Sequence, residues 1–234
     1  MNKHKTKKQK KPLILFSGGL DSTYALICAL QISSVDLLIV KSTRLPPGQY
    51  AEELARNAII DRIKKDTASG KLRYGIDNIH VVDLNIGFGS MIIGEKFAQL
   101  KYWIFSALEV VNPEVHSHVY VGYVSGDGIA PHIHDIKKTW KHLYKVTKIG
   151  KVKISFPLLY LSKQDIVNNL RHSVNEDYLR MAWYCEFPNE ITVGKGKNKR
   201  KEFIACGKCM SCRRMSGIEI PTKSDESSKL IEGG

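Results

Sequence analysis

The chain has 234 residues, 43% of them hydrophobic, and no apolar run approaches the length that spans a membrane. This size allows one substantial core, so we expect one main domain with an appendage and no membrane partner. Lys and Arg outnumber Asp and Glu by 36 to 23, giving a formal net charge of +13 that favours an acidic partner or substrate. The basic start leads into a strand-length apolar run, not a signal peptide, so we expect a cytoplasmic protein.

Strands and helices alternate along most of the chain. Short apolar runs predict strands at residues 13–16, 35–40, 79–84, 119–124 and 154–156. Apolar residues at helical spacing predict helices at residues 24–30, 51–65, 94–111 and 137–144, and a capping-box variant predicts one from Ser162-x-x-Asp165 through Leu170. This order predicts an α/β fold with a doubly wound, parallel, five-stranded sheet, which binds ligands at the carboxyl ends of its strands.

The most informative segment is the turn between the first strand and the first helix, Ser17-Gly18-Gly19-Leu20-Asp21-Ser22-Thr23. A helix start offers backbone N–H groups and a positive dipole end to an anion, and glycines let phosphate oxygens approach the backbone. The hydroxyls can add donors, and Asp21 stands where a magnesium ion needs a carboxylate. The turn therefore predicts a pyrophosphate site, and the alternative is an ordinary Gly-Gly turn that caps a helix.

Four of the five cysteines lie in the last quarter of the chain, at Cys185, Cys206, Cys209 and Cys212. Two overlapping C-x-x-C steps with an upstream cysteine predict a tetrahedral four-thiolate site. Zinc is the simplest metal, and it would be structural because four protein ligands leave no open position. An iron-sulfur cluster is the competing interpretation, while Cys28 stands apart on the first helix and is expected to be a core residue.

The SGGLDS segment resembles the signature of the ATP pyrophosphatase (PP-loop) enzymes, which are adenine nucleotide alpha hydrolase-like, Rossmann-like proteins. This resemblance implies cleavage of ATP between its α and β phosphates, so that a substrate oxygen is adenylated. Neither a Walker-type G-x-x-x-x-G-K-[ST] loop nor a strand followed by G-x-G-x-x-G is present. The sequence thus favours adenylation over phosphoryl transfer.

The early SGGLDST joined to the late Cys…CGxCxxC resembles the 7-cyano-7-deazaguanine synthase (QueC) family, over nearly the whole chain. Weaker matches connect the two ends: Gly48-Gln49 with Glu52 and Arg56, Gly122 with Asp127, Phe156-Pro157-Leu158 with Ser162-Lys163, and Arg213 after the last cysteine.

The family resemblance implies adenylation of 7-carboxy-7-deazaguanine, displacement of AMP by ammonia to give the amide, and a second adenylation that leads to the nitrile. It implies Asp21 and Lys163 as catalytic residues and Gly122 and Asp127 as substrate-binding residues, although Asp127 beside two glycines could equally cap a turn. It implies Mg²⁺, structural Zn²⁺ and an ATP site formed by Phe16, Ser17, Gly18, Gly19, Leu20, Asp21, Ser22, Thr23 and Lys163.

The middle of the chain departs from the family. Phe97–Trp103 stands where the family usually carries Pro-Gly-Arg-Asn, and Gly126–Asp135 replaces its Ser-Gly-Tyr-Pro-Asp run. A divergent branch that joins the activated deazaguanine to another acceptor, such as a protein amine, is therefore an alternative, with His132 and His134 as candidate bases or mere surface residues. Two more functions stay open from the sequence, a tRNA-modifying PP-loop enzyme and a non-catalytic nucleotide-binding docking module.

The expected organisation has four parts. Residues 1–11 form a basic flexible tail, 12–180 the ATP-binding α/β domain, 181–220 the four-cysteine zinc module and 221–234 a flexible terminus. The tail and the basic segment Lys195–Lys201 could bind a nucleic-acid or protein partner or be solvated surface. The sequence is compatible with a homodimer and does not decide the oligomeric state.

Overall fold

A computed structural model describes residues 9–42, 46–84, 98–147, 150–173, 176–194, 199–218 and 230–231. Its centre is a five-stranded sheet with the order β3-β2-β1-β4-β5, in which every neighbouring pair is parallel. The strands are β1 (Lys11–Leu15), β2 (Val35–Ser42), β3 (Ile76–Leu84), β4 (His116–Tyr120) and β5 (Lys153–Ser155). The chain winds outward from β1 in both directions, which confirms the predicted doubly wound fold.

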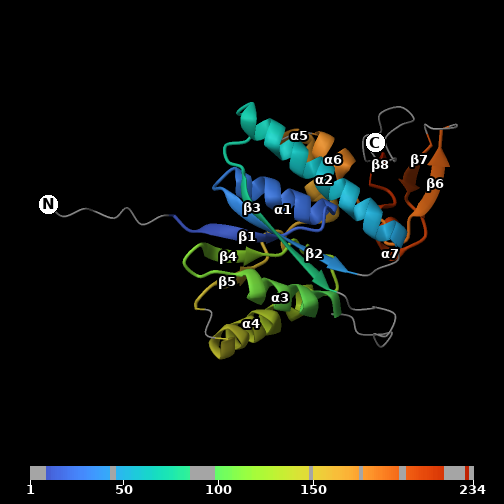
Figure 1. Cartoon of the computed structure of the whole chain (residues 1–234). Coiled ribbons are helices and arrows are strands. Elements are labelled where there is room, and N and C mark those ends of the chain that lie inside the picture. The colour runs from blue at the N-terminus through green and yellow to red at the C-terminus, as the bar shows by residue number, and fades with distance from the viewer. Residues whose placement is uncertain are drawn as a thin grey trace.

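Helices cover both faces of this sheet (Figure 1). One layer contains α1 (Leu20–Leu30), α2 (Pro46–Ala68), α5 (Lys163–Ser173) and α6 (Glu176–Met181), and the other contains α3 (Ala98–Val110) and α4 (Ile133–Thr147), which follows the 3-10 turn η2 (Ala130–His132). The central strand is buried on both sides, because Ile14 packs into the first layer while Leu13 and Leu15 pack into the second. This double burial explains the continuous apolar run at the start of the chain.

A small second sheet lies beside the amino-terminal half of α2. Its strands are β6 (Asn189–Val193), β7 (Arg200–Ile204) and β8 (Leu230–Ile231), ordered β6-β7-β8 and antiparallel, and α7 (Met210–Met215) follows β7. A separate small core joins this unit to α2 through Ala51, Ala55, Trp183 and Phe203, together with Cys185 and Cys212. The four-cysteine segment is thus part of a folded β-containing module.

Several elements differ in extent from the sequence expectation. The fourth strand is residues 116–120, not 119–124, and the residues after Tyr120 form a loop toward the pocket. The helix expected at 51–65 begins at Pro46, because proline is tolerated in the first turn of a helix. The capping box is confirmed: Ser162 N donates to Asp165 Oδ2 (2.8 Å) and Asp165 N donates to Ser162 Oγ (3.1 Å).

Parts of the expected tails lie outside the described residues, namely 1–8, 221–229 and 232–234. So do 219–220 at the end of the expected cysteine module, 195–198 of the basic segment and 94–97 of the third predicted helix. Within the terminus expected to be flexible, Leu230 and Ile231 pair with Phe203 and Glu202 of β7. None of the helices in the described ranges has the length and apolar content needed to cross a membrane.

Candidate functional site

The predicted pyrophosphate turn joins β1 to α1 and is held by its own polar groups. Ser17 Oγ and Ser22 Oγ lie 3.0 Å apart, Gly19 N donates to Ser17 Oγ (3.2 Å), and Ser22 Oγ donates to the Gly19 carbonyl (3.1 Å). Thr23 Oγ1 also donates to the Gly19 carbonyl (2.8 Å) and is fully buried. These bonds fix the turn at the start of α1, where the first N–H groups lack partners within the helix.

Glycine is required at position 18 by its backbone and its surroundings. Its φ is +80°, in the left-handed region, and a Cβ there would lie 2.8 Å from Arg56 Cγ and 3.1 Å from Arg56 N. The Arg56 side chain, only 4% exposed, packs beneath the turn and its Nη1 lies 3.4 Å from the Ser17 carbonyl oxygen. Helix α2 therefore supports the turn from below.

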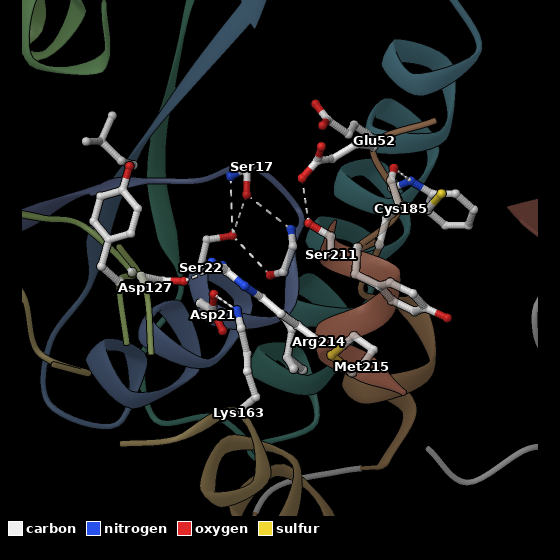
Figure 2. Close-up of a pocket in the computed structure, with 18 of the residues that line it drawn as sticks. Ser17, Asp21, Ser22, Glu52, Asp127, Lys163, Cys185, Ser211, Arg214 and Met215 are labelled. Atoms are coloured by element: carbon white, nitrogen blue, oxygen red, sulfur yellow. Dashed lines mark hydrogen bonds and ion pairs between the residues drawn. The ribbon is translucent and has the colours of Figure 1, made fainter. Parts of the chain in front are cut away.

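Lys163, the first residue of α5, donates to Oδ2 of Asp21 in the first turn of α1 (Figure 2). Burial raises the pKa of Asp21 above its usual 3.8, and the Lys163 charge opposes this shift. The other carboxylate oxygen, Oδ1, is buried and has no hydrogen-bond partner among the described residues. A buried carboxylate oxygen without a donor suits a cation ligand, so Asp21 fits the predicted magnesium site.

These groups open on a pocket of about 260 Å³ at the carboxyl ends of β1 and β4. This is where the winding of the sheet reverses, the expected ligand position in such folds. The turn contributes Ser17, Gly19, Leu20, Asp21 and Ser22 to the wall, and Lys163, Gly122 and Asp127 line it as well. Of the predicted ATP-binding residues, Phe16, Gly18 and Thr23 are not among those lining it.

Gly122 follows β4 and touches the backbone of the turn. A Cβ at this position would lie 3.0 Å from Asp21 C and from Ser22 N, so the absence of a side chain lets the β4 loop pack against the start of α1. Asp127 uses Oδ2 to accept the Val124 N–H (2.9 Å), which is the turn-capping contact, and its substrate role stays a prediction. Its Oδ1 accepts from Arg214 Nη1 at 3.1 Å.

The four predicted metal ligands come together. The Sγ atoms of Cys185, Cys206, Cys209 and Cys212 all lie within 4.8 Å of one another, and those of Cys206 and Cys212 are 3.9 Å apart. A tetrahedral zinc site with Zn–S bonds of about 2.3 Å has sulfur atoms roughly 3.8 Å apart. The donor set and this spacing fit zinc.

Backbone N–H groups around the cysteines favour thiolates. The N–H groups of Lys208 and Cys209 donate to Cys206 Sγ, each at 3.4 Å, and lower the pKa of Cys206 to about 6. Burial raises the pKa values of Cys185 and Cys212 above the usual range. A bound cation would compensate the cost of ionising these two buried thiols.

The segment between α6 and β6 connects the cysteines to the turn and was not foreseen from the sequence. Trp183 N donates to the Gly18 carbonyl (3.0 Å), and its indole N–H donates to the Cys185 carbonyl (2.8 Å). From α7, Ser211, Arg214 and Met215 also line the pocket. The four-cysteine module therefore forms one wall of the same pocket, which a C-x-x-C pattern does not indicate.

A second His/Asp group, Asp36, His80 and His116, lies near the opposite, amino-terminal edge of the sheet. Nδ1 of His116 accepts the Asn112 N–H (2.9 Å), so Nε2 carries the proton and donates to Asp36 Oδ2 (2.9 Å). Lys11 Nζ lies 2.7 Å from Asp36 Oδ1. A metal at Nε2 would need to displace the bridging proton beside this ammonium group, and the described contacts form a hydrogen-bonded network around Asp36.

Comparison with known proteins gives two curated relatives, and no protein-family model matches the chain. A protein named 7-cyano-7-deazaguanine synthase from Nautilia profundicola is 25% identical over 90% of this chain and 94% of its own length. Another of the same name, from Thermoplasma volcanium, is 28% identical over 89% of this chain and 86% of its own length. Each similarity covers about nine-tenths of this chain, so the chain is similar over most of its length to proteins named 7-cyano-7-deazaguanine synthase, from which it has diverged widely.

Proposed function

We propose that the protein is an ATP-dependent carbon–nitrogen ligase that forms AMP and pyrophosphate and converts 7-carboxy-7-deazaguanine and ammonia into 7-cyano-7-deazaguanine. The observation that carries the proposal is the pair Asp21–Lys163, which faces the pocket from the start of α1 beside the Ser-Gly-Gly turn. Names of relatives at 25% and 28% identity support the deazaguanine substrate, and the pocket supports a nucleotide-dependent reaction.

In this proposal the turn holds the phosphates of ATP. The N–H groups at the start of α1 and the hydroxyls of Ser17 and Ser22 face the β and γ phosphates, which leave together as pyrophosphate. A magnesium ion held by Asp21 would neutralise charge on that leaving group. Lys163 moves from its contact with Asp21 to a phosphate oxygen, because the ammonium then pairs with the more strongly charged anion.

The proposed reaction takes two rounds of adenylation, the first on the acid and the second on the amide. A carboxylate oxygen of the acid attacks the α phosphorus, the α–β bond breaks, and pyrophosphate leaves; ammonia then attacks the carbonyl carbon, releasing AMP, a proton and the amide. The amide oxygen attacks a second ATP in the same way, pyrophosphate leaves, and loss of AMP together with both amide N–H protons gives the nitrile. Adenylation is needed because a carboxylate or amide oxygen is otherwise a poor leaving group.

The test is incubation of the purified protein with ATP, magnesium, ammonium and 7-carboxy-7-deazaguanine, with nucleotides and product masses measured together. We expect acid-dependent AMP and pyrophosphate and a nitrile product. The variant D21N should lose this activity, whereas D61N, at an exposed aspartate of α2 paired with Lys64, should keep it. ADP formation, or no acid-dependent AMP with ammonium or any amine acceptor, would refute the proposal.

The competing functions give distinct readouts in the same assay. A tRNA-modifying enzyme would release AMP only when tRNA is present. An enzyme that uses a protein amine would release AMP with the acid and would add the mass of the deazaguanine acyl group to the acceptor protein.

A further inference from the structure

Arg214 enters the pocket from α7, on the side of the cysteine module (Figure 2). Its Nη1 donates to Asp127 Oδ1 at 3.1 Å, across 87 residues of sequence. Among the described lining residues, only Lys163 and Arg214 carry a positive charge. Because the proposed reaction brings two anions together, the phosphate chain of ATP and the carboxylate of the acid, the two cations need separate assignments.

Lys163 belongs to the phosphate side of the pocket. It contacts Asp21 at the start of α1, next to the turn that would hold pyrophosphate. Arg214 instead contacts Asp127, in the loop that follows β4. The two cations therefore have different hydrogen-bonded partners, although the charge of Arg214 also acts on Asp21, and this difference leaves Arg214 as the cation for the second anion.

The surroundings of Arg214 suit a flat, aromatic acid. Trp103 and Tyr123 line the pocket with stacked rings, their centroids 6.2 Å apart and their planes inclined by 28°. Tyr123 belongs to the same loop as Asp127, so one of the two stacked rings and the guanidinium partner come from one segment, while Trp103 comes from α3. A guanidinium carries five N–H donors in a planar fork that matches a carboxylate, and the contact with Asp127 uses one of them.

We propose that Arg214 binds the carboxylate of a planar heteroaromatic acid and that Asp127 holds the guanidinium in place for it. This inference rests on the proposed function, whose substrate is such an acid. Arg214 lies two residues after the metal-ligand candidate Cys212, within the six-residue helix α7. The cysteine module then has a role beyond its own stability, since it places the residue that recognises the acid.

The test compares ligands with and without the carboxylate. Binding of 7-carboxy-7-deazaguanine and of 7-deazaguanine is measured by calorimetry in the presence of an ATP analogue with a non-cleavable α–β bridge. In R214M we expect the affinity for the acid to fall roughly 10- to 100-fold, the range for a lost charge-assisted contact. The affinities for 7-deazaguanine and for the ATP analogue should change less than about 3-fold, within the variation seen without loss of a contact. The matched control is R213M, at an exposed arginine of α7 that is not among the pocket-lining residues.

The outcomes separate the inference from the proposed function. Equal weakening of both deazaguanine ligands would mean that Arg214 acts only through Asp127 or the pocket shape, and a selective loss of ATP-analogue binding would mean that it binds phosphate; either result overturns the inference. An unchanged acid affinity in R214M overturns it too, while the wild type still makes AMP. If the wild type neither binds the acid nor forms AMP, the proposed function and the inference fail together. Partial recovery of acid binding in R214K would support a charge contact.

Discussion

Lys163 binds the carboxylate of Asp21 although 142 residues separate the two in the chain. The contact joins the first turn of α5 to the first turn of α1 over the pocket. It places the predicted phosphate-binding lysine and the predicted magnesium ligand in one ion pair, in which the Lys163 ammonium favours the ionised form of Asp21.

The first prediction concerns pH. Burial raises the pKa of Asp21, and the Lys163 ammonium opposes this shift, so K163M should raise that pKa further. Because Asp21 must be ionised to hold a cation, activity is lost as the pH falls through its pKa, and a higher pKa moves this limb to higher pH. We expect the acidic limb of kcat/KM for AMP release, which reports the free enzyme where Lys163 contacts Asp21, to lie at higher pH in K163M than in the wild type, with K163R close to the wild type. An unmoved limb would show that Asp21 does not govern it.

The second prediction concerns Gly122. In G122A the new methyl group would lie 3.0 Å from backbone atoms of Asp21 and Ser22. These backbone atoms cannot move aside as the end of a flexible side chain could. We expect a stability loss of about 1–3 kcal/mol, typical of overpacking, and weaker ATP-analogue binding. The control is G126A, where an added Cβ meets nothing within 4 Å. Equal effects of the two variants in urea unfolding and nucleotide titration would contradict this account of Gly122.

The third prediction concerns the metal. Elemental analysis should find one zinc per chain, and C206S should lose it because one thiolate ligand is missing. Loss of a structural metal removes several kcal/mol of folding free energy, so the melting temperature should fall by roughly 5–15 °C. C28S changes the one cysteine outside the cluster and should keep both the zinc and the melting temperature near the wild-type values. Iron together with acid-labile sulfide would instead identify an iron-sulfur cluster.

The fourth prediction concerns stability in acid. Burial lowers the pKa of His116 below its usual 6.5, despite the nearby Asp36 carboxylate. In the unfolded chain this histidine is protonated below about pH 6.5, whereas in the folded chain it is protonated only at lower pH. The free energy of unfolding therefore falls as the pH drops from 6.5 toward the lowered pKa of His116. We expect H116Q to be less stable at pH 7.5 by about 1–2 kcal/mol, through a lost buried hydrogen bond, but to lose less on going to pH 5. H134Q, at an exposed histidine of α4, should keep the wild-type slope in urea unfolding.

The main sheet could be predicted because its signals are local. Doubly buried strands give apolar runs such as residues 13–16, and the glycine turn, the capping box at Ser162 and the C-x-x-C-x-x-C spacing each lie within a few residues of sequence. The relatives support the family resemblance drawn from the same motifs. Strand ends were less accurate, since residues 121–124 are apolar for packing near the pocket and not because they continue β4.

The pocket contacts and the small second sheet could not be predicted, because they depend on contacts between segments that are distant in the sequence. Nothing near Arg214 in the sequence shows that it meets Asp127, and nothing near Trp183 shows that its N–H reaches the Gly18 carbonyl. The β6–β7 pair escaped prediction because each five-residue strand carries only two apolar residues and neither forms a longer apolar run. Such short strands are stabilised by packing on α2 and by the cysteine cluster, which local propensity does not record.

The position of Trp183 also gives the protein an optical reporter. This residue lies in the pocket wall, with its backbone N–H bonded to the Gly18 carbonyl of the predicted phosphate-binding turn and its indole N–H bonded to the Cys185 carbonyl. Of the other two tryptophans, Trp140 is buried between α4 and the sheet at 2% exposure, and Trp103 can be replaced by phenylalanine. In such a single-replacement protein, changes in emission would follow nucleotide binding and metal loading at one position, without any attached dye.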